Sequence, residues 1–100
     1  MIYITQLIYI KIGEELTFNQ FEDVAIPIIS KYNGQLLLRL RPSENEIIER
    51  AIESPYEVHI IKFDTDEDLD NFMKDEERKK FLYLKEKSIK TSILIKGQQL

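Results

Sequence analysis

A chain of 100 residues has the length of a single domain, and its 43% hydrophobic content is enough to build a core. Its 18 acidic and 14 basic residues give a formal net charge of −4, which argues against nucleic acid or an anionic membrane surface as the main partner. The sequence holds no cysteine, which excludes disulfides and fits the cytoplasm, and no stretch reaches the roughly 18 apolar residues that span a bilayer.

The first segment, residues 2 to 12, predicts a strand. Isoleucine occupies most of its even positions, and its odd positions are also largely apolar, with Tyr3 and Tyr9 among them. A strand with one face exposed to solvent would show polar residues at every second position. We therefore expect this strand at the centre of a sheet, covered on both faces.

A helix is expected next, because Thr17 and Gln20 have the spacing of a capping box and an apolar stripe follows them. Pro27 lies inside this helix and removes one backbone hydrogen bond, which predicts a kink or a loosened turn. Asn33 and Gly34 tolerate left-handed backbone angles, so the helix is expected to end there.

Residues 35 to 41 predict a second strand, in which the three even-numbered leucines share one face and Arg39 and Arg41 share the other. The polar face indicates a position at the edge of the sheet. Residues 43 to 54 start with another capping box and have helical spacing, which predicts a short connecting helix that Pro55 ends.

Residues 56 to 63 form a β-rich run that predicts a third strand, and Thr65 then starts a second helix. The charged run around Asp75 interrupts the apolar pattern, so this helix is expected to break there. The basic residues that follow, Arg78 among them, alternate with glutamates, which is typical of a solvated helix face. Residues 89 to 96 alternate again and predict the last strand.

This order of elements, βαββαβ, predicts the fold class α+β. With right-handed crossovers it gives a ferredoxin-like sandwich, a four-stranded antiparallel sheet with two helices on one face, as a single domain over residues 1–100. The other sheet face then has no cover from its own chain.

An apolar patch is expected on that open face, formed by Tyr3, Leu7, Tyr9, Leu94 and the side chains of the third strand that share the parity of Ile60. A patch of this size usually marks an interface. Two such sheets packed around a two-fold axis would bury it, so we expect a homodimer.

Several motifs along nearly the whole chain support this interpretation: the step at residues 26–28, the corner Tyr32-Asn33-Gly34, and the strand 60–63 ahead of a helix that carries Phe72. In these motifs the sequence resembles the dimeric α/β-barrel proteins, and most closely a small bacterial family known only as a domain of unknown function. The resemblance implies a dimeric α/β barrel of ferredoxin-like protomers. The wider superfamily includes cofactor-free monooxygenases, haem-degrading enzymes, isomerases and binding modules, so the fold does not settle the function.

His59 is the only histidine and the candidate for a general base. If Phe63 packs under the helices, strand parity places His59 there as well. A core histidine that is hydrogen-bonded within the sheet is then the simpler interpretation, because a lone histidine without a surrounding constellation seldom signals catalysis.

Four further residues are candidates for ligand binding. Tyr3 and Tyr9, with Ile60 on the same face, would line a pocket or serve as interface aromatics. Arg39, with Arg41 beside it, would hold a carboxylate or phosphate, or act as an edge charge that discourages aggregation.

No metal or cofactor is predicted, because the acidic run between residues 64 and 70 lacks the spacing of a calcium loop and is explained by the helix dipole. The leading hypothesis is a cytoplasmic homodimer that binds a small, partly apolar or aromatic molecule between sheet and helices. The alternative is a cofactor-independent enzyme of the monooxygenase type with His59 or a tyrosine as base. A third possibility is an assembly module without a ligand.

Overall fold

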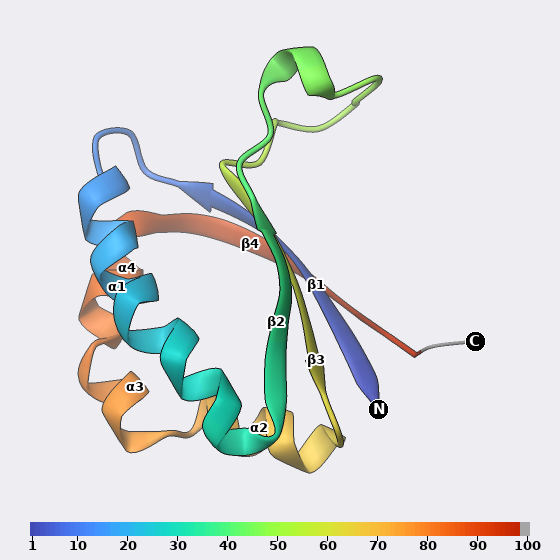
Figure 1. Ribbon diagram of the computed structural model, residues 1–100. Helices are drawn as coiled ribbons and strands as arrows, with labels where there is room; N and C mark the ends of the chain where they lie inside the picture. The colour runs from blue at the N-terminus through green and yellow to red at the C-terminus, as the bar shows by residue number, and fades with distance from the viewer. Residues whose placement is uncertain (99–100) are drawn as a thin grey trace.

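Four strands pair antiparallel in the order β2-β3-β1-β4 in the computed structural model, which describes residues 1–98 (Figure 1). They are β1 (Ile2–Ile10), β2 (Gly34–Leu40), β3 (Glu57–Phe63) and β4 (Ile89–Gly97). The helices are α1 (Glu15–Ile28), α2 (Asp66–Met73), α3 (Glu76–Lys80) and α4 (Leu82–Ser88), with the 3-10 turns η1 (Ile29–Tyr32) and η2 (Glu44–Glu46). The predicted ferredoxin-like fold is confirmed, with β1 inside the sheet and β2 at its edge.

The core lies between the sheet and the helices, which Figure 1 shows on one side of the sheet. Alternate residues of β1 and β3 point into it, since every second position of β3 is buried. The buried apolar side chains are Ile2, Ile4, Ile8, Tyr9, Phe18, Phe21, Ala25, Ile28, Ile29, Ile61, Phe63 and Phe72.

The start of α1 was predicted wrongly. The helix begins at Glu15, and the Thr17 hydroxyl donates to the Glu14 carboxylate at 2.8 Å instead of capping the chain. The change expected at Pro27 is found, because α1 ends one residue later and continues as the tighter turn η1. Asn33 then adopts a left-handed conformation with φ 55°, which confirms the predicted stop.

A bulge in β2 changes which side chains face the helices. Leu36 pairs with Ile61, but the register shifts at the next residue, so that Leu38 pairs with Ile60 and Arg39 pairs with His59. The prediction that the three even-numbered leucines share one face is therefore wrong. The bulge turns Arg39 toward the helices and sends Leu38 to the open face of the sheet.

The connecting helix predicted for residues 43–54 does not form. Only η2 is helical, and Figure 1 shows the segment projecting as an arm beyond the sheet. The side chain of Ile48 is fully exposed. The segment therefore lacks the packing of an apolar face that would stabilise a helix. The Glu44 carboxylate instead binds Arg50 and Ser54 across the arm.

The second half follows the predicted pattern in its helices but not in β4. The Thr65 hydroxyl accepts from the Asp68 backbone, and the expected break falls at Asp75, which caps α3. Leu94 pairs with Gln6 on the side of the helices, so its assignment to the open face is wrong. Ile93 and Ile95 lie on the open face instead.

Within residues 1–98, no helix combines the length and the apolar character needed to cross a membrane.

Candidate functional site

Two polar side chains of β3 point into the core. Glu57 and His59 follow one another on the buried side of the strand, ahead of Ile61 and Phe63, with exposed fractions of 0% and 2%. His59 therefore lies on the same side as Phe63, under the helices, as the parity argument predicted. Burial of two ionisable groups without water demands polar partners.

Glu57 finds these partners on two strands. Its carboxylate accepts from Arg41 Nε at 2.8 Å, from Arg39 Nε at 3.0 Å and from His59 Nε2 at 2.5 Å. Burial alone would raise the pKa of Glu57, but the hydrogen bonds from His59, Arg39 and Arg41 lower it to about 2. Because an ionised carboxylate only accepts, a hydrogen of the His59 ring lies on Nε2.

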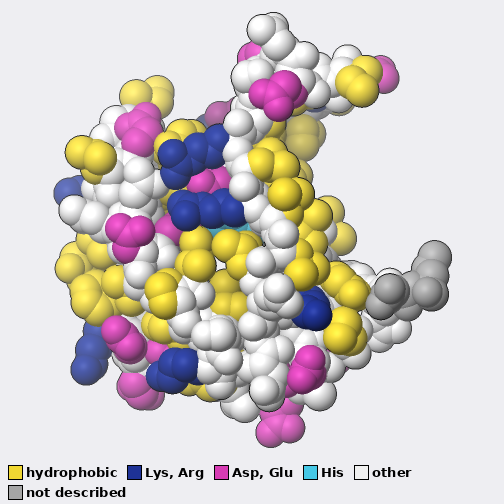
Figure 2. Space-filling view, in the orientation of Figure 1, with side chains coloured by type: hydrophobic (Ala, Val, Ile, Leu, Met, Phe, Trp, Pro, Cys, Tyr) yellow, Lys and Arg dark blue, Asp and Glu magenta, His cyan; other side chains and the backbone are white. Residues whose placement is uncertain are grey.

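Arg39 and Arg41 are partly exposed at the edge of the sheet, with 33% and 44% of their side chains accessible, but both are bound to the buried Glu57. Arg41 also donates to the side-chain oxygen of Asn19 on α1 at 2.6 Å, and its guanidinium stacks on the ring of Tyr56 at 4.9 Å. The two arginines line an open groove of about 640 Å³ between α1 and β2. Figure 2 shows basic and acidic side chains packed together in this hollow.

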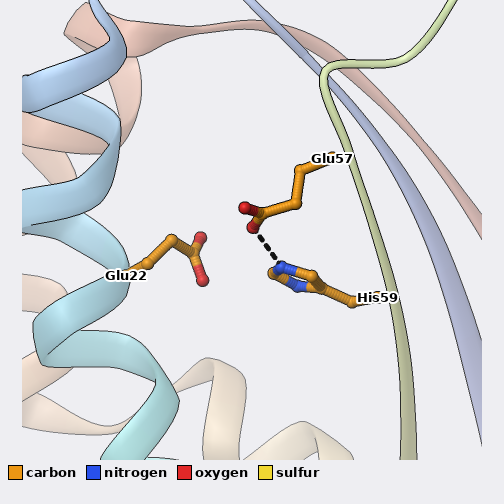
Figure 3. Close-up of side chains that lie close together, drawn as sticks. All are labelled: Glu22, Glu57 and His59. Atoms are coloured by element: carbon orange, nitrogen blue, oxygen red, sulfur yellow. Dashed lines mark hydrogen bonds and ion pairs between the residues drawn. The ribbon is translucent and has the colours of Figure 1, made fainter. Parts of the chain in front are cut away.

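Glu22 completes the constellation from the opposite side. It projects from α1 with only 6% of its surface exposed, and its carboxylate faces the Glu57 and His59 pair (Figure 3). One ligand atom from each of the three lies within 4.8 Å of the others. Burial raises the pKa of Glu22, partly opposed by His59. The sequence analysis did not identify Glu22 or Glu57 as site residues. Its premise that His59 has no other ionisable groups around it was therefore wrong.

The charges around this group favour an anion over a metal ion. Carboxylate and imidazole are ligand types that divalent metals accept. The oxygens of Glu57, however, are already bound to two guanidinium groups. Four basic side chains surround the two carboxylates of Glu22 and Glu57. They are Arg39, Arg41, Arg78 and Lys85. A further cation would therefore be repelled at short range.

A chamber lies between the sheet and the helices beside Glu22 and His59. It consists of two adjoining cavities of about 50 and 190 Å³, and both are lined by Gln6, Ile61, Phe72, Arg78 and Lys85. Glu22 and His59 line the smaller cavity only. The larger cavity is mostly apolar, and its further walls are Ile4, Phe63, Leu69, Met73, Ser92 and Leu94. The chamber thus has a polar end and an apolar end.

Arg78 is the least satisfied group of the chamber. It is 6% exposed and lies between the rings of Phe21 and Phe72, at 5.8 and 5.2 Å from their centroids. One guanidinium nitrogen donates to the carbonyl of Met73 at 3.2 Å, but Nε has no hydrogen-bond partner among residues 1–98. The prediction that Arg78 belongs to a solvated helix face is therefore wrong.

The nearest acidic groups do not neutralise Arg78. The Asp75 side chain accepts from the Tyr32 hydroxyl at 2.6 Å, from Lys31 at 3.3 Å and from the backbone of Arg78. Burial lowers the pKa of the Arg78 guanidinium, and it also lowers the pKa of Lys85, which Arg78 lowers further. The Arg78 guanidinium and the Lys85 ammonium are thus both partly removed from water. Among residues 1–98, no carboxylate is hydrogen-bonded to either group.

The two tyrosines do not share a pocket. Tyr9 is 4% exposed because its own chain covers it, and its hydroxyl donates to the carbonyl of Glu53 at 2.9 Å. Tyr3 lies in a separate depression beside Ile95. Ile60 is half-buried on the open face, where it pairs with Thr5. The idea that Tyr3 and Tyr9 line one ligand pocket is not supported by these positions.

The open face carries an apolar patch even so. Leu38 and Leu40 from β2 and Ile93 and Ile95 from β4 are 37% to 53% exposed on it. Figure 2 shows hydrophobic side chains gathered along the edge of the sheet that borders this face. The half-buried Ile60 continues the patch at the centre of the sheet.

Solved structures share this fold over nearly the whole of this chain. A protein of unknown function from Rhodopseudomonas palustris has 12% identity and a TM-score of 0.84 over 99% of this chain and 82% of its own. A protein from Arabidopsis thaliana has 10% identity and a TM-score of 0.77, over 100% and 96%. An uncharacterised NIPSNAP domain protein from Burkholderia xenovorans has 11% identity and a TM-score of 0.71, over 100% and 95%.

At these identities the likeness establishes the ferredoxin-like fold alone and leaves the family and the function open. No protein-family model and no curated protein matches the sequence.

Proposed function

We propose that this protein is a homodimer that binds a small, partly apolar organic anion, such as a carboxylate, in the chamber between sheet and helices. The observation that carries the proposal is Arg78, a buried guanidinium whose Nε lacks a partner within residues 1–98, beside the half-buried Lys85. The chamber continues from these groups into an apolar pocket.

The physical argument is that a buried cation needs a charge partner. An unpaired buried charge destabilises the fold, and a carboxylate placed beside Arg78 and Lys85 would remove that penalty. Hydrogen bonds between a guanidinium and a carboxylate are charge-assisted and contribute about 1.5–3 kcal/mol each. The apolar remainder of the ligand would contact Leu69 and Met73 at the other end of the chamber.

The homodimer is proposed on the apolar patch of the open face. An unpartnered sheet face with aliphatic side chains on both edge strands is the surface that a second copy would bury. We also propose cytoplasmic location, on the absence of cysteine from the sequence, and kinship with the small bacterial family of unknown function that the motifs resemble.

Titration calorimetry with benzoate and 4-methylpentanoate tests the binding claim. We expect both carboxylates to bind and benzamide, which lacks the charge, not to bind. Arg78→Met should weaken binding at least 10-fold, whereas the control Lys79→Met, at an exposed neighbouring position, should leave it unchanged. Equal affinity of benzoate and benzamide, or an unaffected Arg78→Met variant, would overturn the proposal, and a dimer that binds neither would favour an assembly module.

A further inference from the structure

We propose that the chamber carries an acid–base activity, in which Glu22 moves a proton to and from a carbon acid held at Arg78, with His59 beside it as a second proton-carrying group. The substrate class is a small 2-oxo carboxylate with an apolar substituent. This inference rests on the proposed function, because it uses the same chamber and the same anion-binding groups.

Glu22 and His59 face the same small space from opposite walls. Glu22 comes from α1 and His59 from β3, both line the 50 Å³ cavity, and both are at least nine-tenths buried. Arg78 and Lys85 line that cavity too. A ligand whose carboxylate binds Arg78 therefore brings its neighbouring carbon atoms next to Glu22, and its larger apolar part extends into the 190 Å³ cavity.

The two carboxylates have opposite environments, which separates their roles. Glu57 accepts from two arginines and stays ionised, so it acts as a positioning residue that fixes the His59 ring. With the hydrogen on Nε2, the nitrogen of His59 that can take up a proton is Nδ1, the same division of labour as in carboxylate–histidine pairs of hydrolases. Glu22 lies in the less polar position, where a carboxyl group exchanges its proton closer to neutral pH.

The reaction is a proton transfer at the carbon next to the ketone. The Glu22 carboxylate takes a proton from that carbon, and the electron pair of the C–H bond moves into the carbonyl, which gives an enolate. Arg78 and Lys85 hold the negative charge that develops on the oxygen. Return of the proton from the Glu22 carboxyl to the same carbon regenerates the ketone, so that no oxidant or reductant takes part. In D2O the carbon gains deuterium.

Deuterium exchange at C3 of 4-methyl-2-oxopentanoate, followed by proton NMR, tests the inference. We expect the wild-type protein to accelerate the exchange above the buffer rate and Glu22→Gln to lose at least 100-fold of that acceleration, the range of general acid–base catalysis. Glu15→Gln, an exposed position on the same helix, is the control and should keep full activity. Glu22→Gln is close in shape and should still bind the probe by calorimetry.

The outcomes separate the two claims. A wild type that binds the probe without accelerating exchange overturns the proton-transfer inference alone, and so does a Glu22→Gln variant at the full rate. A wild type that does not bind the probe overturns the proposed function together with this inference.

The positioning role of Glu57 has its own readout. The ring ¹⁵N chemical shifts of His59 should show the hydrogen of the neutral ring on Nε2, and Nδ1 should be the nitrogen that responds to the probe. A neutral ring with its hydrogen on Nδ1 would contradict the role given to Glu57.

Discussion

The two faces of the sheet each depart from the usual distribution of side chains. The face under the helices buries Glu57 and His59 within an otherwise apolar core, and the arginine partners of Glu57 are partly exposed, while the open face exposes leucine and isoleucine on both edge strands. Soluble domains normally bury apolar groups and leave charges in water. Each face therefore motivates one proposal: a bound anion beside Arg78 on one side, and a second chain over the aliphatic patch on the other.

The largest expected effect comes from the ion cluster of the covered face. Glu57→Gln would leave Arg39 and Arg41 without their carboxylate, and we expect a loss of about 2–3 kcal/mol in the free energy of unfolding, because water screens the two partly exposed guanidinium groups. Urea denaturation measures it. Glu53→Gln, which removes only an exposed ion pair with Lys90, is the control and should change stability by less than about 1 kcal/mol.

The same pair gives a pH test. The pKa of Glu57 is lowered to about 2 in the folded protein, so its contribution is present above the ordinary value of 4.5 and is lost as pH falls from there toward 2. Stability should fall steeply over that window in the wild type. A wild-type curve as flat in this range as that of Glu57→Gln would contradict the ion cluster.

Packing under the helices can be compared with packing at the end of β4. A Cβ added at Gly34 would approach the Phe63 ring to 2.6 Å and the Ile29 side chain to 2.7 Å, whereas at Gly97 it would meet no atom of residues 1–98 within 4 Å. We expect Gly34→Ala to destabilise by about 1–3 kcal/mol and Gly97→Ala to be nearly neutral. Thermal unfolding followed by circular dichroism distinguishes them, and equal melting temperatures would contradict the close contact at Gly34.

A charged substitution on the open face tests the proposed dimer interface. Ile93→Lys should weaken the proposed dimer at least 10-fold in analytical ultracentrifugation, because a desolvated ammonium would lie in an apolar interface. At a protein concentration low enough for both proteins to be monomeric, the Ile93→Lys variant and the wild type should have nearly the same melting temperature. Ile12→Lys, at an isoleucine that is fully exposed outside the sheet, is the control. A monomeric wild type at micromolar concentration would remove the dimer altogether.

The smallest expected effect concerns Glu22. Its pKa is raised by burial, so the protonated form is stabilised below the ordinary value of 4.5 and this advantage is lost as pH rises through the raised pKa. Charged groups around it are Glu57 and His59 on β3, Arg39 on β2, Arg78 on α3 and Lys85 on α4. Glu22→Gln should be more stable than the wild type at pH 8, by about 1 kcal/mol, and equal to it at pH 4. A variant that is less stable at pH 8 would contradict a desolvated Glu22.

The order of elements was predictable because periodicity is a local property. The alternation in β1 and β3 and the stops at Asn33 and Asp75 were visible in the sequence and are found in the structure. The bulge in β2 was not, since a shift by one residue depends on the pairing partner. That shift decides that Arg39 faces His59.

The site was only partly predictable. Strand parity tied the face of His59 to that of Phe63, and both lie under the helices, but the partners of His59 were missed. Glu22 follows Phe18 by four residues and precedes Ala25 by three, so an acidic residue inside an apolar helical stripe was the available signal. Glu57 stands two residues before His59, on the same face of the strand. Arg78 belongs to a five-residue helix with a sequence typical of a surface, and only tertiary packing shows that it is buried.

The central claim is that the buried cations of the chamber hold a small organic anion. A ¹⁵N–¹H NMR titration with benzoate tests it most directly, because each backbone amide reports on its own surroundings. We expect saturable shifts that are largest at Gln6, Phe72, Arg78 and Lys85. Shifts confined to the open face around Tyr3 and Ile95, or no shifts at millimolar benzoate, would contradict it.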